Sequence, residues 1–476
     1  FSSERAKIRN CAIVLVSFAA SGIGISSSGI IGLPSFRYLN AVNPFLTNQD
    51  NLTDSVAEHM TTSLSLSFTF LSVFLIFAVI GIWFLFSKKT INLRTDMRIF
   101  AIFTSIIAIY VSSAFVRLEL FASVGIIILG SIGLAILTQK IFEQNKQCFT
   151  KIIFPVVIII LFIIPLTMPE DNTWLSWADF PPSILNGGSS FTNFAANDWK
   201  DATLWIKQNT SEDAVIASWW DYGYWITTLS DRTTIADNAT LINWQINKLA
   251  YSLITHPENS WHILSSHYTE DISQYLGDET ILAFGGKLES EFNKFYLEKH
   301  GVVCEQIFKA DAQKLGDGKL EESCNPITKG MDADYLLIYL AGERFYVDGA
   351  NVPLYMLEGG GDESKKTWFT KISNHQLSKY IESDNITPTK FYMENTTLGM
   401  LTPFSIFKYV EIGTGRTFDT FQNGLIPVYI NDLKFKDSET DPFYLVYASP
   451  SFYSQDSGIM SAVLIYKINH DYNPQN

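Results

Sequence analysis

Apolar residues gather in the first 168 positions of the chain. A helix needs roughly 20 apolar residues to cross a bilayer. Stretches that approach or exceed this length are 10–33, 64–86, 98–116, 118–138 and 152–168. The third and fourth form one apolar run that Arg117 and Glu119 interrupt, which predicts a hairpin turn there. The first part is therefore predicted to be a polytopic α-helical membrane region with five spans.

Lysine and arginine stand in three groups along this region and predict its orientation. The groups are Arg5, Lys7 and Arg9; Lys88, Lys89, Arg94 and Arg98; and Lys140, Lys146 and Lys151. Basic loops stay on the cytoplasmic side of a membrane. The N-terminus of this chain is therefore predicted to be cytoplasmic. The loop 34–62, the Arg117 turn and everything after Met168 are predicted to lie outside the cell membrane.

After residue 168 the pattern changes to that of a mixed α/β fold. Apolar residues at helical spacing predict helices over 197–209 and 241–254, with a buried strand over 214–217 between them. From Phe404 onward, short segments rich in Tyr, Phe, Val and Ile alternate with Gly and Pro, which predicts a β-rich end. The expected domains are the membrane region, a mixed α/β extracellular core and a β-rich C-terminal subdomain, over 1–168, 169–400 and 401–476.

Composition and charge exclude several classes of protein. With 47% hydrophobic and 17% charged residues, the chain is too apolar to be disordered. The first part carries a formal charge of +5 and the second part −19. An acidic domain repels the phosphate backbone that dominates nucleic-acid affinity, so a nucleic-acid partner is disfavoured. The partner of the first part is expected to be membrane lipid.

Cysteine positions agree with this topology. Cys11 lies in a predicted span and Cys148 in a predicted cytoplasmic loop, where thiols stay reduced. Cys304 and Cys324 are both predicted to be extracellular, where they can form a disulfide or remain two buried thiols. The C-x2-C spacing of zinc sites is absent, which disfavours zinc.

The most specific motif follows the predicted strand 214–217 and consists of Trp219, Trp220, Asp221, Tyr222 and Gly223. Indole N–H groups only donate, a carboxylate only accepts, and a hydroxyl does both. The two tryptophans and Asp221 can therefore satisfy one Ser or Thr hydroxyl completely. A site built in this way rejects a ligand that lacks the hydroxyl, because its own polar groups are left unpaired. The alternative is an aromatic turn packed into the core.

This motif carries a resemblance to a known family. Residues 218–224, SWWDYGY, resemble the WWDYG signature of the catalytic subunit of oligosaccharyltransferase, the membrane enzyme of asparagine-linked protein glycosylation, and 232–238 fit the same family. The resemblance runs along the whole chain. It implies the last five spans of a GT-C type membrane domain and the C-terminal ectodomain, with the N-terminal half of the family's sequence missing.

Two further positions match motifs of this family. Residues 55–59, SVAEH, are similar to its S/T-V-x-E motif, which implies that Glu58 contacts a divalent metal site and the acceptor amide. Arg117 matches an arginine that holds the lipid pyrophosphate, a role that suits a bidentate cation at the membrane surface. The alternatives are a solvated loop acid for Glu58, and for Arg117 an interfacial anchor or a partner of Glu119.

A third match lies in residues 362–369, DESKKTWF, after three glycines. Spacing of three and then four places Asp362, Lys365 and Phe369 on one helix face, with Asp362 as the expected helix cap. This segment resembles the family's DK motif, which contacts the acceptor's hydroxy residue. The family usually has Met or Ile where Phe369 stands. The glycines lack the pattern of a nucleotide-binding loop.

The resemblance implies the transfer of an oligosaccharide from a lipid-linked, dolichol-type pyrophosphate or phosphate donor to the Asn side chain of N-x-S/T in extracytoplasmic proteins. Mg2+ or Mn2+ is the expected cofactor, because the ligands are oxygens. The expected partners are the lipid-linked donor and acceptor polypeptides. We also expect a single-subunit enzyme of archaeal type.

The chain starts at Phe1, so we expect either a processed N-terminus or the C-terminal part of a longer protein. The family's other metal carboxylates lie before anything in this chain, which predicts that the 476 residues alone have no transferase activity. Two alternatives stay open. One is a non-catalytic membrane-anchored protein that binds a peptide or glycan, and the other is a membrane glycosyltransferase that acts on a Ser or Thr hydroxyl.

Overall fold

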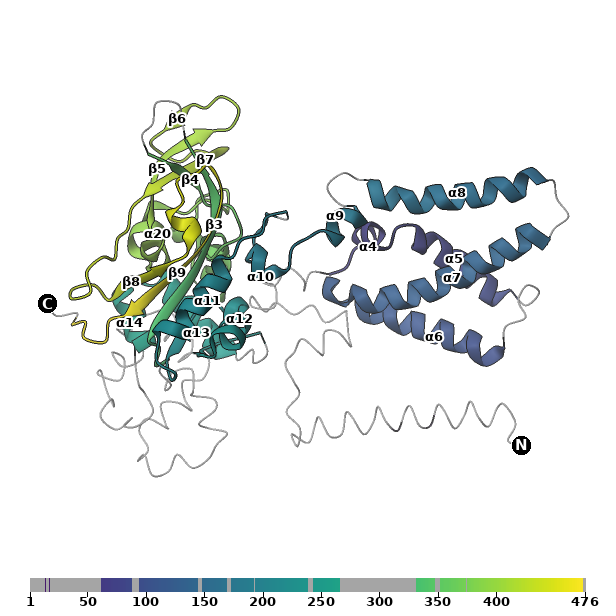
Figure 1. Cartoon of the computed structure of the whole chain (residues 1–476), viewed down its shortest axis with the longest axis horizontal. Helices are drawn as coiled ribbons and strands as arrows, with labels where there is room; N and C mark the ends of the chain where they lie inside the picture. Colours follow the sequence, from purple (N-terminus) through teal and green to yellow (C-terminus); the bar gives the residue numbers. More distant parts are fainter. Residues whose placement is uncertain are drawn as a thin grey trace. The chain divides into compact units, whose positions relative to one another are not determined.

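The chain folds into two units in the computed structural model, Phe1–Ala178 and Asp179–Asn476 (Figure 1). The residues that the structure describes are Ile13, Ser17, 61–87, 94–143, 148–168, 173–191, 193–238, 243–265, 331–346, 352–373 and 375–473.

The first unit is entirely helical over its described residues. Its elements are α4 (Leu64–Leu71), α5 (Val73–Phe86), α6 (Thr95–Ser112), the 3-10 turn η2 (Val116–Leu118), α7 (Glu119–Glu143), α8 (Cys148–Thr167) and α9 (Trp174–Ala178). Within the described ranges, three segments are long and apolar enough to cross a membrane: α6, η2 together with α7, and α8. The pair α4 and α5 makes a fourth if it counts as one span.

The predicted spans are therefore confirmed only in part. The stretches 98–116, 118–138 and 152–168 are helices, and the hairpin turn at Arg117 is present as η2. The stretch 64–86 is instead two helices bent by 101°. Ser72 makes the break, with a left-handed φ of 42°. The stretch 10–33 lies outside the described residues apart from two positions.

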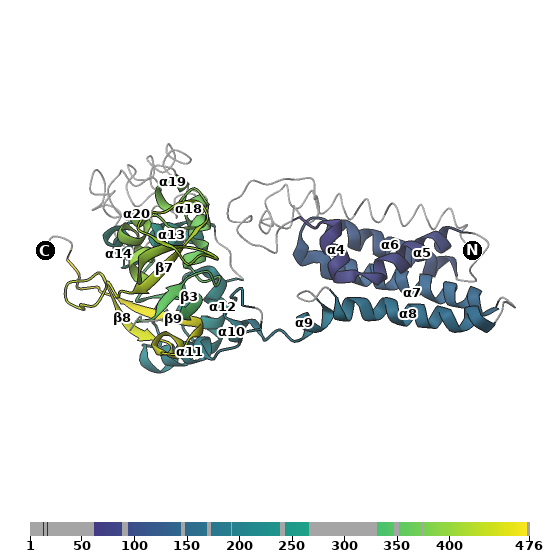
Figure 2. The same ribbon diagram turned by 90° about the horizontal axis from the view of Figure 1, so that it is seen from above.

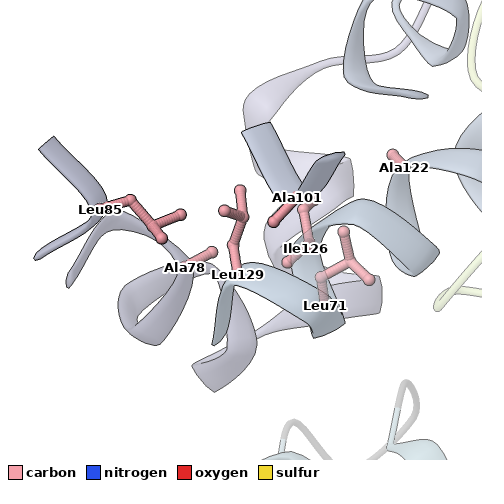
Figure 3. Close-up of a cluster of buried hydrophobic side chains, with 7 residues drawn as sticks. All are labelled: Leu71, Ala78, Leu85, Ala101, Ala122, Ile126 and Leu129. Carbon is pink, nitrogen blue, oxygen red and sulfur yellow. The ribbon is translucent and has the colours of Figure 1, made fainter. Parts of the chain in front are cut away.

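Close contact between helix backbones holds this unit together. A Cβ at Gly81 on α5 would lie 2.0 Å from the carbonyl oxygen of Leu129 on α7, and one at Gly133 would lie 2.2 Å from that of Phe77. Lipid tails are as apolar as leucine, so membrane helices associate through such small-residue packing. A cluster of small and aliphatic side chains fills the space beside these contacts (Figure 3): Leu71, Ala78, Leu85, Ala101, Ala122, Ile126 and Leu129.

The second unit combines one mixed sheet with helices. Its helices are α10 (Ser183–Asn186), α11 (Asp198–Asn209), η3 (Trp220–Tyr222), α12 (Gly223–Trp225), η4 (Ile226–Ser230), α13 (Asn243–Ile254), α14 (Pro257–Ser265), η7 (Glu363–Lys365), α18 (Lys366–Ile372), α19 (Leu377–Tyr380), α20 (Lys390–Asn395), α21 (Thr397–Leu401) and α22 (Pro450–Tyr453). Its strands are β1 (Val215–Ala217), β2 (Thr233–Thr234), β3 (Tyr335–Phe345), β4 (Leu354–Met356), β5 (Phe404–Glu411), β6 (Thr417–Phe418), β7 (Leu425–Asn431), β8 (Phe443–Ala448) and β9 (Gly458–Ile468).

Strand β3 is the centre of the sheet. The strand order is β2-β1-β3-β4-β7-β5-β6, and β9 pairs with β3 and β8. Strand β1 runs parallel to β2 and β3, whereas β4 and β9 are antiparallel to β3. Figure 2 shows α11 on one side of the strands and α13, α14, α18 and α20 on the other. Buried on both faces, β3 reads as a nearly continuous apolar run.

Most of the elements predicted for this unit are present. The predicted helices match α11 and α13, and the predicted strand matches β1. Strands β5–β9 make up the β-rich end, and β7 and β9 pair with β4 and β3. The sheet is thus continuous across residue 400, where the sequence suggested a boundary.

Candidate functional site

The WWDYG segment leaves the sheet at the end of β1. Trp219 keeps an extended backbone (φ −57°, ψ 138°), and η3, Trp220–Tyr222, follows directly. Gly223 is required by close packing, because a Cβ there would lie 2.3 Å from the carbonyl oxygen of Ala236. The glycine therefore lets this turn approach the chain that follows β2.

Arg232, in the stretch that follows the motif, ties this turn to α11. Its side chain is buried and donates to the carbonyl oxygens of Lys207 and Thr210 at 2.9 and 3.0 Å, and to that of Asp231 at 2.9 Å. A cation at these carbonyls satisfies acceptors that the end of a helix leaves open. Arg232 is thus a structural residue of the turn.

A second segment, which begins at Gly359, reaches the same place along β3. The Gly359 N–H donates to the Ala341 carbonyl oxygen at 3.0 Å, and the Asp362 N–H donates to the Tyr339 carbonyl oxygen at 2.7 Å. A Cβ at Gly361 would lie 2.7 Å from that Tyr339 oxygen. The glycine run therefore allows tight packing against β3.

Polar side chains from the two segments form one hydrogen-bonded cluster. Lys365 Nζ donates to Asp221 Oδ2 and to the Tyr222 hydroxyl, both at 2.9 Å. The Tyr222 hydroxyl donates to Asp362 Oδ1 at 2.8 Å, and the Tyr339 N–H donates to Asp362 Oδ2 at 2.8 Å. The structure thus brings the WWDYG and DK-like segments together.

The helix cap predicted for Asp362 is wrong. Asp362 precedes η7, but its side chain makes no capping hydrogen bond. Its two oxygens instead accept from Tyr222 and from the Tyr339 backbone. The α-helix starts only at Lys366, after the 3-10 turn. A tertiary donor on β3 therefore replaces the local cap that the sequence suggested.

Phe369 supports the site by packing against Trp219. Its side chain is fully buried, and its ring meets that of Trp219 edge to face with centroids 4.6 Å apart. Such aromatic pairs add about 0.5–1.5 kcal/mol beyond the burial of their area. In this arrangement Phe369 braces Trp219 and has no surface for a ligand.

The two carboxylates of the cluster, those of Asp362 and Asp221, differ in how deeply they are buried. Asp362 is 1% exposed, and desolvation raises its pKa to about 6 against the lowering effects of Lys365 and its hydrogen bonds. Burial, followed by the charges of Asp362 and Asp221, raises the pKa of Tyr222 well above its usual value. The side chains of Asp221 and Lys365 keep 35% and 22% exposure. A ligand can therefore reach Asp221 and Lys365.

A buried ion pair that was not predicted from the sequence lies one residue along from the cluster. Lys366 Nζ lies 2.8 Å from Glu363 Oε1, and both side chains are 4% exposed. The signal was present, because Glu363 and Lys366 have the same spacing of three as Asp362 and Lys365. One short segment thus contains a buried ion pair, Glu363 with Lys366, and two residues of the site, Asp362 and Lys365.

Trp199 on α11 was also missed. It is almost fully buried, and its ring lies against those of Tyr222, Trp225 and Tyr339, with centroids 4.7, 4.9 and 5.5 Å apart. This aromatic cluster holds the buried ring of Tyr222 in place. The helical spacing of Trp199 marked it as core without showing what it supports.

The donors and acceptors that the site leaves unused are matched in number. In the described part of the chain, the buried Nε1 of Trp220 has no hydrogen-bond acceptor. Lys365 has three N–H donors, of which Asp221 and Tyr222 take two. One oxygen of Asp221 accepts no hydrogen bond from the described residues. A hydroxyl group, with one donor and two lone pairs, complements this set.

Other predicted site residues fall elsewhere. Arg117 is exposed on η2 in the first unit. Glu58, Cys304 and Cys324 lie outside the described residues. Among the residues that are described, no three His, Cys, Asp or Glu side chains are grouped to hold a metal ion.

Comparison with known proteins finds similarity to one family. Residues 211–304, which include the whole WWDYG segment, match the STT3/PglB/AglB core domain. The chain is a relative of the STT3/PglB/AglB proteins. It is 25% identical over 348 residues to the dolichyl-diphosphooligosaccharide–protein glycosyltransferase subunit STT3B of Arabidopsis thaliana, covering 66% of this chain and 46% of that protein. It is 26% identical over 306 residues to subunit STT3 of Saccharomyces cerevisiae, covering 60% and 42%.

This STT3/PglB/AglB relative spans less than half the length of the curated proteins it matches. The archaeal oligosaccharyltransferase AglB from Archaeoglobus fulgidus, solved in complex with an inhibitory peptide and a dolichol-phosphate, aligns with 94% of this chain and 45% of its own. That alignment has 12% identity and a TM-score of 0.44, which is too low to support a structural argument.

Proposed function

We propose that the full-length protein transfers an oligosaccharide from a lipid-linked pyrophosphate or phosphate to the side-chain nitrogen of Asn in N-x-S/T. In this reaction the bond from the sugar C1 to the phosphate oxygen breaks, and a bond from C1 to the amide nitrogen forms. The amide loses a proton and the phosphate leaves with the electron pair. The core-domain match and the STT3 relatives support this proposal.

One observation carries the acceptor side of the proposal. Trp220, Asp221 and Lys365 together present unused donors and an acceptor in the numbers that a hydroxyl needs. We assign to them the Ser or Thr hydroxyl two residues after the acceptor Asn. Asp221 accepts a hydrogen bond from this hydroxyl, while Trp220 and Lys365 donate hydrogen bonds to its lone pairs. Trp219 and Phe369 form the apolar support beneath them.

The donor side rests on the first unit. We assign the lipid-linked phosphate to Arg117, because an exposed guanidinium at the end of two apolar helices suits bidentate phosphate binding at a membrane surface. A single-subunit assembly, an archaeal source and a C-terminal domain outside the cell membrane belong to the same proposal.

The metal is a separate proposal, and the described residues do not by themselves form its site. We propose that Glu58 is one oxygen ligand of Mg2+ or Mn2+, an ion that would neutralise the departing phosphate. Transfer by the full-length protein should stop after chelation and return when either ion is added. Transfer that survives exhaustive chelation would contradict this assignment.

Substitution of Asp221 tests the acceptor site. The full-length protein with Asp221→Asn should transfer to an Asn-Ala-Thr peptide about 100-fold more slowly, because an amide in place of the carboxylate leaves the hydroxyl without its charged acceptor. The matched control is Asp456→Asn, an exposed aspartate in the loop between α22 and β9. Unchanged transfer by the Asp221 variant would refute the assignment.

Two acceptor peptides distinguish the remaining alternatives for the function. Modification of a peptide that has Thr but no Asn would favour a transferase that acts on hydroxyl groups. Binding of the Asn-Ala-Thr peptide without any transfer, in the full-length protein with its donor and metal, would favour a membrane-anchored binding protein.

A further inference from the structure

The Tyr222 hydroxyl lies at the centre of a chain of hydrogen bonds that ends at the exposed pair. The chain runs from the Tyr339 N–H to Asp362, from Tyr222 to Asp362, and from Lys365 to Tyr222 and Asp221. Each link measures 2.8 or 2.9 Å. The buried Asp362 is thus connected to the partly exposed ammonium group through one phenol, and its Oδ1 also lies 3.9 Å from Lys365 Nζ.

The chemistry of the groups fixes the direction of these bonds. An ammonium only donates, so Lys365 must donate to Tyr222, and an ionised Asp362 only accepts, so Tyr222 must donate to Asp362. The Tyr222 hydroxyl has no other proton to give. Asp362 therefore sets the orientation of the lone pairs that Tyr222 offers to Lys365.

Asp362 is too deeply placed to touch a ligand. It is 1% exposed, and each of its oxygens already accepts one hydrogen bond. Tyr222 is also buried, at 2% exposure. Neither residue can contact a ligand, but both contact Lys365, through which they can affect ligand selection.

We propose that Tyr222 and Asp362 are positioning residues that hold the Lys365 ammonium against Asp221 and thereby set the preference of the site for a hydroxyl over a methyl group. The part that concerns the ligand rests on the proposed function. A free lysine side chain loses rotamer freedom when it binds a ligand, and a lysine that is already anchored does not lose it again. Two anchors at 2.9 Å prepare Lys365 in this way.

The substitution Tyr222→Phe isolates the hydroxyl. Lys365 Nζ lies 4.5 Å from the centre of the Tyr222 ring, a contact that phenylalanine preserves. The matched control is Tyr466→Phe, because Tyr466 is fully buried and donates one hydrogen bond of 2.6 Å to the Leu401 carbonyl oxygen, away from the site. The two variants each lose one buried phenol hydroxyl.

The first measurement needs no ligand. The chain in detergent is labelled with an amine-reactive reagent, and the rate at Lys365 is followed by mass spectrometry. Tyr222→Phe should raise this rate about five-fold, the effect of losing one hydrogen bond from a held amine. Tyr466→Phe should leave it unchanged. An unchanged rate at Lys365 in Tyr222→Phe would overturn the proposal.

Asp362→Asn provides a second route to the same result. Its amide nitrogen faces the Tyr222 oxygen as a donor, so the phenol can no longer donate there and its lone pairs turn away from Lys365. The labelling rate at Lys365 should rise more than in Tyr222→Phe, because this substitution also removes the carboxylate charge that lies 3.9 Å from Lys365 Nζ. This keeps the proposal testable even if one of the two variants fails to fold.

The second measurement uses two peptides of equal size, Asn-Ala-Thr and Asn-Ala-Val, and compares their binding. Tyr222→Phe should lower the Thr-to-Val affinity ratio about five-fold. Combined with Lys365→Met, it should lower the ratio no further than Lys365→Met alone, because the effect passes through Lys365. An additional loss in the double variant would overturn the route through Lys365.

The two measurements distinguish a failure of the proposed function from a failure of the positioning role. If the unsubstituted protein binds both peptides equally, the proposed function fails, and the labelling rate still decides whether Tyr222 and Asp362 position Lys365. If the peptides are distinguished and the ratio does not respond to Tyr222→Phe, the proposed function stands and the positioning role is refuted.

Discussion

Two lysines that are neighbours in sequence make ion pairs of opposite character. Lys366 pairs with Glu363 three residues away, and both side chains are 4% exposed. Lys365 pairs with Asp221, which is 144 residues away in sequence, and their side chains keep 22% and 35% exposure. The N–O distances of the two pairs are almost equal, at 2.8 and 2.9 Å.

The difference shows how one short segment serves both the fold and the site. Water cannot replace a lost partner in the buried pair, so breaking that pair leaves an uncompensated charge in the core. Water or a ligand can replace a partner in the exposed pair at little cost. The Glu363–Lys366 pair therefore anchors the segment, and the Asp221–Lys365 pair can exchange partners.

Loss of the buried pair should have the largest effect on stability. Lys366→Met should lower the free energy of unfolding by about 4 kcal/mol, because Glu363 remains buried without its partner. Chemical unfolding of the detergent-solubilised chain measures this change. A loss below about 1 kcal/mol would show that the Glu363–Lys366 pair is solvated, and it would remove the contrast with the Asp221–Lys365 pair.

Asp362, next to the buried pair, should give the second largest effect, as a dependence on pH. Its pKa is raised from 3.8 to about 6, so between these values the folded protein binds more protons than the unfolded chain. Its contribution to stability is therefore fully present at low pH and falls as the pH rises towards 6. The stability advantage of the unsubstituted protein over Asp362→Asn should shrink by about 2 kcal/mol between pH 4 and 7.

Thermal unfolding of both proteins at a series of pH values measures this shrinkage. The comparison with Asp362→Asn cancels the titration of the other carboxylates, which the two proteins share. A constant difference between the two proteins across this range would mean that Asp362 does not titrate there.

The apolar support beneath the exposed pair should be more tolerant. Phe369→Met restores the residue type expected from the family, and Met adapts to an irregular space of similar volume. We expect a loss of about 1 kcal/mol in the free energy of unfolding, from the edge-to-face contact with Trp219. Near-ultraviolet circular dichroism should show a changed environment for Trp219, and an unchanged spectrum would contradict the contact.

Loss of the exposed pair should affect stability least. Lys365→Met should change the free energy of unfolding by about 0.5 kcal/mol, since the pair is partly solvated. The same unfolding measurement applies as for Lys366→Met, which makes the two variants a matched pair. Equal losses in the two variants would abolish the distinction between anchor and exchangeable pair.

The sequence predicted local features of the fold well. Helical spacing located α11 and α13, and the short apolar run before the tryptophan pair located β1. The break at Ser72 was not predictable, because a serine in an apolar run carries no helix-stop signal of its own. The kink depends on how α4 and α5 pack.

The candidate site was predictable in its members and less so in their roles. Spacing placed Asp362, Lys365 and Phe369 on one face, and each of them contacts a residue of WWDYG. The pattern did not show that Asp362 is buried, because its partners lie 23 residues away at Tyr339 and 140 residues away at Tyr222. Nor did it show that Phe369 is covered by Trp219.

The pairing of β3 with β9 has a consequence for the order of events during synthesis. Tyr339 on β3 pairs with Val463 on β9, and its hydroxyl is hydrogen-bonded to that of Ser461, 122 residues later in the chain. A ribosome takes about 6 to 24 s to make that length. Until then one edge of β3, the strand whose Tyr339 N–H donates to Asp362, has no partner, although the WWDYG segment has been synthesised long before. In a nascent chain, Lys365 is therefore not held in place until β9 has paired with β3.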